Sequence, residues 1–190
     1  MNHILTTERL EIRLLQDCDF NDIVEIHRIP EVTRYMLHEP WTAADAEIRF
    51  QAMKRNDKMI PEKGLCFGVV FQERVIGDVS FWFTEMQQTV EIGYAFHPEY
   101  SGRGLASEAV SALIHHIFDN YPIHRLQANV DGRNRKSMAL CKRAGMRQEA
   151  YFISDFWYKG KWSDSAVFGL LREEVLEKKE SEDLRQGNGV

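Results

Sequence analysis

The sequence is poor in the features that mark several protein classes. It contains three cysteines and five prolines among 190 residues, and Cys18, Cys66 and Cys141 lack the spacing of metal ligands. This usage argues against a disulfide scaffold or a zinc site and favours a reducing compartment. No apolar run approaches the roughly 18 residues that a membrane-spanning helix requires. Met1–Arg9 has no apolar stretch after a basic start, so we expect no signal peptide and a cytoplasmic protein.

The sequence also has fewer basic than acidic residues. The chain has 24 Lys and Arg against 29 Asp and Glu, a formal net charge of −5. Proteins that bind nucleic acid non-specifically usually present a basic face. We therefore expect neither nucleic acid nor a membrane as a partner, whereas a cationic partner such as an amine is compatible with this balance.

The apolar content, in contrast, is ample for one packed core. Hydrophobic residues make up 44% of the chain and aromatic residues 11%. The length suits one compact domain, which we expect to cover residues 1–172. Residues 173–190 are rich in charge and end in Gly-Asn-Gly-Val, so they are predicted to form a frayed helix followed by a disordered tail.

Apolar periodicity predicts a mixed succession of elements. Alternation predicts strands, and apolar residues at helical spacing predict helices. The strands are expected over 10–15, 65–71, 75–83, 89–96, 126–130, 146–158 and 162–171, and the helices from residue 20, over 30–35, from 43 to 53, over 102–119 and over 134–144. Lys159–Lys161 is predicted to be the hairpin turn between the last two strands.

The stretch Tyr100–Glu108 carries the most chemical information. It follows a predicted strand and opens a predicted helix, with small residues at Gly102, Gly104 and Ala106. Free N–H groups at a helix start and close backbone approach together suit a pyrophosphate. Taken alone, the two glycines are explained as well by a tight turn. The third glycine of the dinucleotide fingerprint and the Gly-Lys-Ser/Thr of a triphosphate loop are absent.

The same stretch matches a coenzyme-binding pattern, Gln/Arg-x-x-Gly-x-Gly/Ala. The matching residues are Ser101, Gly102, Arg103, Gly104, Leu105 and Ala106. Ser101 departs from the pattern, since Gln or Arg is usual there. Three further segments follow the same family's order: Glu91–Tyr94, Asn134–Ser137 and Ala144–Met146. On these residues the chain resembles the GNAT superfamily of N-acetyltransferases.

The resemblance covers roughly residues 5–172 and extends to one branch of the superfamily. Thr7–Arg13 and Trp157–Asp164 are similar to the branch that acetylates the N-termini of ribosomal proteins. The implied fold is the α/β (α+β) acyl-CoA N-acyltransferase fold, a mixed and mostly antiparallel sheet of about seven strands with helices on both faces. The implied reaction is direct transfer from acetyl-CoA to a primary amine, without a metal.

The resemblance also implies how the coenzyme binds. The strands over 89–96 and 126–130 would splay apart and hold the pantetheine arm. Backbone N–H groups of Tyr94, Ala95 and Phe96 would pair with the arm and polarise the thioester carbonyl. Residues 101–106 would hold the pyrophosphate, Asn134 would hydrogen-bond the pantetheine amides, and Ser137 would also contact the coenzyme. Arg133, Arg135 and Lys136 either meet the ribose phosphate or form a solvated basic turn.

Two carboxylates are candidates for the catalytic base. An ammonium has no lone pair, so the acceptor must lose a proton before it attacks. Glu91 is the first candidate, and Asp155 is the second because it lies in the segment that closes the site in the resembled family. An ordinary solvent-facing strand residue remains the alternative for Glu91.

The leaving thiolate has one candidate proton donor. Many members of the resembled family use a tyrosine in the helix after the glycine motif, and Cys141 stands there in this chain. Ser137 is therefore the candidate acid, as in the ribosomal-protein branch. A serine in the first turn of a helix can instead serve only its own backbone. A thiolate can also leave without assistance.

The acceptor is the least determined part of the prediction. The branch resemblance favours the N-terminal α-amino group of a protein, and a small-molecule amine is the alternative, because a fold does not fix a substrate. A CoA-binding regulatory module without activity and a purely structural protein remain as rivals of other classes. We expect a monomer or a homodimer.

Overall fold

The computed structural model describes residues 4–54 and 64–177 of the chain. Its strands are β1 (Ile4–Thr6), β2 (Glu11–Leu14), β3 (Leu65–Phe71), β4 (Arg74–Phe83), β5 (Thr89–Phe96), β6 (Arg125–Asp131), β7 (Arg147–Tyr158) and β8 (Lys161–Leu171). Its α-helices are α1 (Phe20–Arg28), α2 (Pro30–Thr33), α3 (Ala46–Lys54), α4 (Leu105–Asn120) and α5 (Arg135–Arg143). Short 3-10 turns, η1 (Asp17–Asp19) and η2 (Pro98–Tyr100), precede α1 and α4.

The strands form one sheet in the order β1-β2-β3-β4-β5-β6-β8-β7. All neighbours pair antiparallel except β5 and β6, which are parallel. The mixed, mostly antiparallel sheet is confirmed, with eight strands where about seven were predicted. The additional strand is β1, whose three residues are too short to show a period of two.

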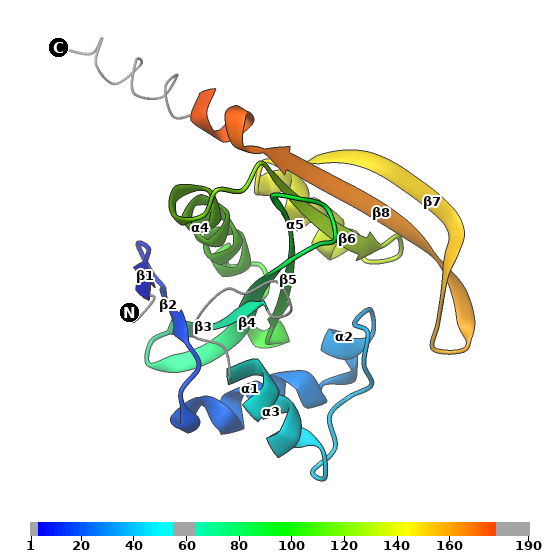
Figure 1. Cartoon of the computed structure of the whole chain (residues 1–190). Coiled ribbons are helices and arrows are strands. Elements are labelled where there is room, and N and C mark those ends of the chain that lie inside the picture. Colours follow the sequence, from blue (N-terminus) through cyan, green and yellow to red (C-terminus); the bar gives the residue numbers. More distant parts are fainter. Residues whose placement is uncertain (1–3, 55–63, 178–190) are drawn as a thin grey trace, which may run out of the picture.

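Helices cover both faces of the sheet, as predicted (Figure 1). On one face, Val110 and Leu113 of α4 and Leu140 of α5 pack into the larger core cluster. On the opposite face, a smaller cluster gathers Ile23 of α1 and Phe50 of α3. The strand residues alternate between these two cores, so a residue's parity in a strand tells which face it serves.

Strands β7 and β8 extend past the body of the sheet as a curved arm (Figure 1). The turn at its tip has Lys159 at φ 51° and Gly160 at φ 70°. Two consecutive left-handed residues form the tight hairpin turn whose twist matches the flanking strands. The predicted turn is therefore found where Lys159–Lys161 was expected, and β8 already begins at Lys161.

Several helix boundaries differ from their predicted positions for local reasons. Helix α4 begins at Leu105, not near residue 102, because Gly102 and Gly104 have φ of 77° and 79°, which a right-handed helix cannot hold. Helix α3 begins at Ala46, not at residue 43, and the Thr42 backbone N–H donates to Asp45 Oδ1 at 2.8 Å just before it.

The end of the chain is partly described. Residues 172–177 are helical, and Val175 is buried in the larger core. Residues 55–63 and the predicted tail beyond residue 177 lie outside the described residues. Among the residues that are described, no helix is long and apolar enough to cross a membrane.

Candidate active site

The two parallel strands separate after three residue pairs. Thr89, Val90 and Glu91 pair with residues 125–127 of β6. Beyond Glu91, β5 continues to Phe96 on β4 alone, while β6 continues to Asp131 on β8. The predicted splay is therefore present, and we call the opening between 92–96 and 128–131 the notch. It leaves one edge of β5 without a partner strand.

A loop of glycines with left-handed backbone lies between β5 and α4. Gly104 is the N-cap residue of α4, and no side chain caps the helix there. The first internal bond of the helix runs from the Glu108 N–H to the Gly104 carbonyl at 3.0 Å. The N–H groups of residues 105–107 therefore have no acceptor within the helix. A side chain added at Gly102 would meet nothing within 4 Å. This open helix start fits a pyrophosphate.

The connection between β1 and β2 holds this loop in place. Arg9 Nε donates to Glu108 Oε2 at 2.7 Å, and Arg9 Nη1 donates to the Arg103 carbonyl at 2.9 Å. The Arg103 guanidinium in turn lies over the Phe71 ring, 4.8 Å from its centroid. Partial burial raises the pKa of Glu108, but hydrogen bonds from Thr7 and Arg9 outweigh it and hold that pKa below its ordinary value. Sequence reasoning did not assign a role to Arg9.

A cluster of hydroxyl and thiol groups lies on the α4–α5 face of the notch. The Tyr94 and Ser137 hydroxyl oxygens are 2.6 Å apart, and the Tyr94 hydroxyl is 3.3 Å from Cys141 Sγ. Burial raises the pKa of Tyr94, so its hydroxyl keeps its proton. Asn134 Oδ1 accepts from the Ser137 backbone N–H at 3.1 Å and caps α5. The hydroxyl of Ser137 therefore faces Tyr94 rather than its own backbone.

Tyr94 is the residue whose side chain the sequence reasoning missed. The prediction used only its backbone N–H, because the resembled motif places a tyrosine on the helix. In the structure the hydroxyl of Tyr94, from β5, lies next to Cys141 on α5. It therefore occupies the place where the helix itself carries no tyrosine. The alternation of side chains along the strand could have predicted this position. Tyr94 lies on the same face of β5 as Val90 and Ile92, which are in the core beneath α4 and α5.

Glu91 lies at the base of the notch on the opposite face. Its neighbours Val90 and Ile92 point into the α4–α5 core, so its side chain points toward the face that carries α1 and α2. Glu91 Oε2 accepts from Gln127 Nε2 at 3.0 Å and from Asn129 Nδ2 at 2.7 Å. The two amides fix the carboxylate beside the point where the strands part.

The other candidate base, Asp155, is not brought to the notch. It is exposed on β7, between Phe152 and Phe156, where the register with β8 shifts. Strand β8 separates β7 from β6, so two interstrand spacings, roughly 10 Å, lie between Asp155 and β6.

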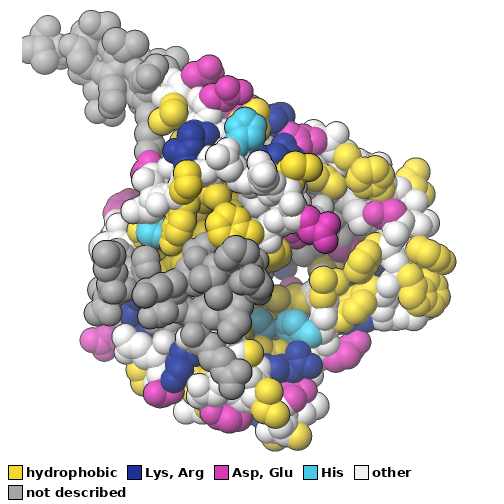
Figure 2. Space-filling view, viewed as in Figure 1, with side chains coloured by type: hydrophobic (Ala, Val, Ile, Leu, Met, Phe, Trp, Pro, Cys, Tyr) yellow, Lys and Arg dark blue, Asp and Glu magenta, His cyan; other side chains and the backbone are white. Residues whose placement is uncertain are grey.

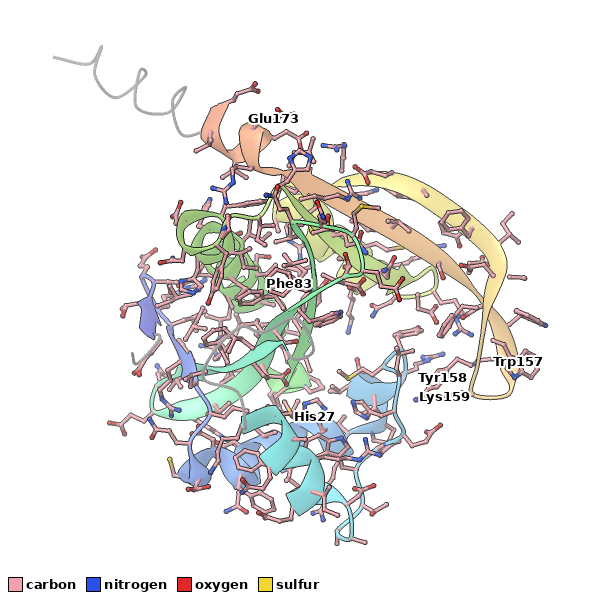
Figure 3. All side chains as sticks on the ribbon, viewed as in Figure 1. His27, Phe83, Trp157, Tyr158, Lys159 and Glu173 are labelled. Carbon is pink, nitrogen blue, oxygen red and sulfur yellow. The ribbon has the colours of Figure 1, made fainter. Side chains whose placement is uncertain are left out.

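The tip of the arm is fastened to the α2 region. Lys159 Nζ donates to the carbonyls of Thr33 at 2.9 Å and His38 at 2.8 Å. Figure 3 shows Tyr158 and Lys159 on the side of the arm that faces α2, with Trp157 on the outer side. Figure 2 shows the surface hollowed between the arm and the body, with hydrophobic side chains along the arm. The notch is thus approached from this side through an opening bounded by α2 and β8.

Two cavities differ in their relation to the notch. One of about 290 Å³ is lined by Arg34, Tyr35, Arg133 and Lys161, beside the approach. A larger one, of about 580 Å³, lies past the far end of α4, where Phe118 and Arg172 line it. It shares no residue with the predicted site. No group of His, Cys, Asp and Glu within 4–54 and 64–177 could hold a metal ion.

Comparison with known proteins agrees with this geometry. Residues 9–147 match the Acetyltransferase (GNAT) domain family. The uncharacterized N-acetyltransferase YnaD of Bacillus subtilis (strain 168) is 30% identical over 172 residues, 90% of this chain and 98% of that protein. The [ribosomal protein uS5]-alanine N-acetyltransferase of Escherichia coli (strain K12) is 26% identical over 87% of this chain and 89% of its own length.

A solved GNAT-family acetyltransferase from Bacillus anthracis superposes with a TM-score of 0.81 at 26% identity, covering 90% of this chain and 99% of that one. The chain therefore belongs to the GNAT acetyltransferase family. Its reaction class is N-acetyl transfer, with acetyl-CoA as the cosubstrate.

Proposed function

We propose that the protein acetylates the N-terminal α-amino group of a protein or peptide. The relative that acts on the alanine of ribosomal protein uS5 matches over nearly the whole of both chains, which supports an N-terminal acceptor. The observation that carries the mechanism is the arrangement of the notch: a carboxylate lies on one face and a pair of hydroxyl groups on the other.

The coenzyme side of the reaction rests on backbone groups. The open start of α4 and the N–H groups of residues 103–106 bind the pyrophosphate. The free edge of β5 pairs with the pantetheine arm, and an N–H among Tyr94, Ala95 and Phe96 stabilises negative charge on the thioester oxygen. The amide of Asn134 keeps its N–H groups available, because its oxygen caps α5.

Proton transfer uses both faces. Glu91, directly or through a water molecule, takes the proton that the amine gives up as its nitrogen bonds to the acetyl carbon. The C–S bond then breaks, and the departing thiolate receives a proton from the Ser137 hydroxyl. Tyr94, whose hydroxyl lies 2.6 Å away and stays protonated, hydrogen-bonds the Ser137 oxygen and stabilises the charge that develops there, while solvent returns a proton to Ser137 and takes one from Glu91.

Peptide acetylation tests the proposal directly. A peptide with a free N-terminus and no lysine is compared with a matched peptide whose N-terminus is blocked and which carries one lysine. With acetyl-CoA, mass spectrometry should detect acetylation of the first peptide and not of the second. Acetylation of small amines alone would move the assignment to a small-molecule acceptor. Coenzyme binding without transfer to any amine would favour a regulatory module.

A further inference from the structure

The smaller cavity near the notch has an unusual charge. Arg34, Arg133 and Lys161 supply three of its four lining residues, in a chain whose formal net charge is −5. Like charges gathered in one concave site repel one another unless an anion joins them. The cavity of about 290 Å³ is large enough for a carboxylate with its neighbouring atoms, but small for a whole coenzyme.

The protein's own acids offset only part of this charge. Arg133 Nε donates to Asp131 Oδ1 at 2.8 Å, and this pair is internally neutral. Arg34 lies over the Tyr35 ring, 5.4 Å from its centroid. In the part of the chain that is described, neither Arg34 nor Lys161 forms an ion pair. Lys161 also interacts electrostatically with Asp131, and Arg133 with Asp164. The three cations therefore outnumber the two nearby carboxylates by one, and this net positive charge is available to a ligand.

The cavity lies close to the reacting end of the notch. Arg133 lies in the turn directly before Asn134, the N-cap residue of α5, whose Oδ1 accepts from the Ser137 backbone N–H at 3.1 Å. An ion pair between Lys136 and Glu31, 3.1 Å long, joins the first turn of α5 to α2. The α2 side of the cavity is also the side toward which Glu91 points. A group bound in this cavity would therefore lie on the side from which the acceptor is proposed to enter.

We propose that this cavity binds an acidic side chain of the acceptor, in the second or third residue behind the reacting amine. The proposal rests on the proposed function and specifies its substrate class. An extended peptide advances about 3.3–3.6 Å per residue. When the amine is at the thioester, the second and third residues of such a peptide lie roughly 3–7 Å farther out, and the proposal places them against Arg34 and Lys161. The guanidinium and the ammonium would bind its carboxylate by charge-assisted hydrogen bonds.

A phosphate of the coenzyme is the competing anion for the same groups. The two sources differ in which kinetic constant depends on the cavity. If the acceptor supplies the anion, loss of a cation raises the acceptor KM. If the coenzyme supplies it, the same substitution raises the acetyl-CoA KM and leaves peptide preference unchanged.

The test uses two peptides with free N-termini that differ only in Asp or Asn at the second and third positions. Wild type is compared with Arg34→Gln and Lys161→Gln, and with Lys142→Gln, which removes an equivalent exposed charge from the other end of α5. Wild type and Lys142→Gln should favour the Asp peptide by about tenfold in kcat/KM. This is the smallest ratio expected from one hydrogen bond to a charged group. The two cavity variants should lose most of this preference, and Arg34→Lys should retain part of it.

Equal kcat/KM for the two peptides in wild type would overturn the inference while leaving the acetyltransferase function intact. A raised acetyl-CoA KM in the cavity variants, with the preference retained, would assign the cavity to the coenzyme. If neither peptide is acetylated, calorimetry with CoA-saturated protein decides. Tighter binding of the Asp peptide that depends on Arg34 supports the inference even though the proposed function has failed, and equal binding rejects both.

Discussion

The two faces of the notch are built by different means. On the coenzyme face, the groups proposed to meet the ligand are backbone N–H groups and side chains from two short segments, 94–106 and 134–141. On the acceptor face, the proposed groups are side chains from three separate places: Glu91 in β5, Arg34 after α2 and Lys161 in β8.

This difference follows from what each face recognises. The coenzyme is one molecule, and a pyrophosphate can be held by a helix start and glycine geometry that leave their trace in a local motif. An acceptor is distinguished by its side chains, so the acceptor face needs particular side chains brought together by folding. Substitutions on the two faces should therefore have separable effects, on acetyl-CoA binding and on acceptor use.

The largest effect is expected at Gly104. Glutamate there must adopt φ near 79° and brings a negative charge to the pyrophosphate position. Gly104→Glu should abolish the rise in melting temperature that saturating acetyl-CoA produces in wild type, where a ligand at 100 times its Kd contributes about 2.7 kcal/mol. Gly160→Glu is the matched control: it adds the same side chain at φ 70° on the arm, with nothing within 4 Å. A retained coenzyme shift in Gly104→Glu would contradict the assignment of this loop.

The next effect concerns Glu91 on the acceptor face. Glu91→Gln keeps the size of the side chain but cannot take a proton, so kcat should fall about 10²-fold or more. The Kd for acetyl-CoA should stay within about twofold, because the change lies on the other face. Steady-state kinetics gives kcat, and calorimetry on the same preparation gives the Kd for acetyl-CoA, so the effects on catalysis and on coenzyme binding are measured separately. A full kcat in the variant would exclude Glu91 as the base.

A smaller effect is expected for the hydroxyl pair on the coenzyme face. Ser137→Ala and Tyr94→Phe should each lower kcat by about tenfold, since a thiolate is a fair leaving group even without a donor. The double variant should lose little more than Ser137→Ala alone, because Tyr94 acts through the Ser137 hydroxyl. Multiplicative losses in the double variant would show that the two groups act independently.

The smallest effect concerns the support of the glycine loop. Glu108 has a lowered pKa, because the hydrogen bonds of Thr7 and Arg9 outweigh the opposing effect of burial. Its contribution is fully present above its ordinary value of 4.5 and is lost as pH falls through the lower folded value. The Arg9 side chain is 41% exposed, so Glu108→Gln should cost under about 1 kcal/mol. Urea unfolding at about pH 7 and about pH 3 should find a smaller difference at the lower pH.

Much of the fold and of the coenzyme face could be predicted from sequence because local patterns encode them. The glycine loop, the strand before it and the helix that starts near Asn134 each have a signature within a few residues. The Tyr94 side chain was missed because its partner, Ser137, is 43 positions away and only the parity of β5 brings them together. Arg9 was missed for a similar reason, since Glu108 follows it by 99 positions.

The acceptor face was harder to predict because its geometry depends on tertiary contacts. The sequence gives no local reason for Arg34, Arg133 and Lys161 to share a cavity. They meet because Lys159 fastens the arm to α2 and because Glu31 pairs with Lys136. Asp155 illustrates the opposite case: position in a resembled segment suggested a base, but β8 lies between its strand and the notch.

Calorimetric titration of the wild-type protein with acetyl-CoA and with free CoA tests the central claim most directly. The account predicts that each binds at one site per chain with micromolar affinity, and that the binding heat disappears in Gly104→Glu but persists in Gly160→Glu. Absence of binding of either ligand to folded wild-type protein would contradict it, because every catalytic role proposed for the notch depends on the coenzyme being held there.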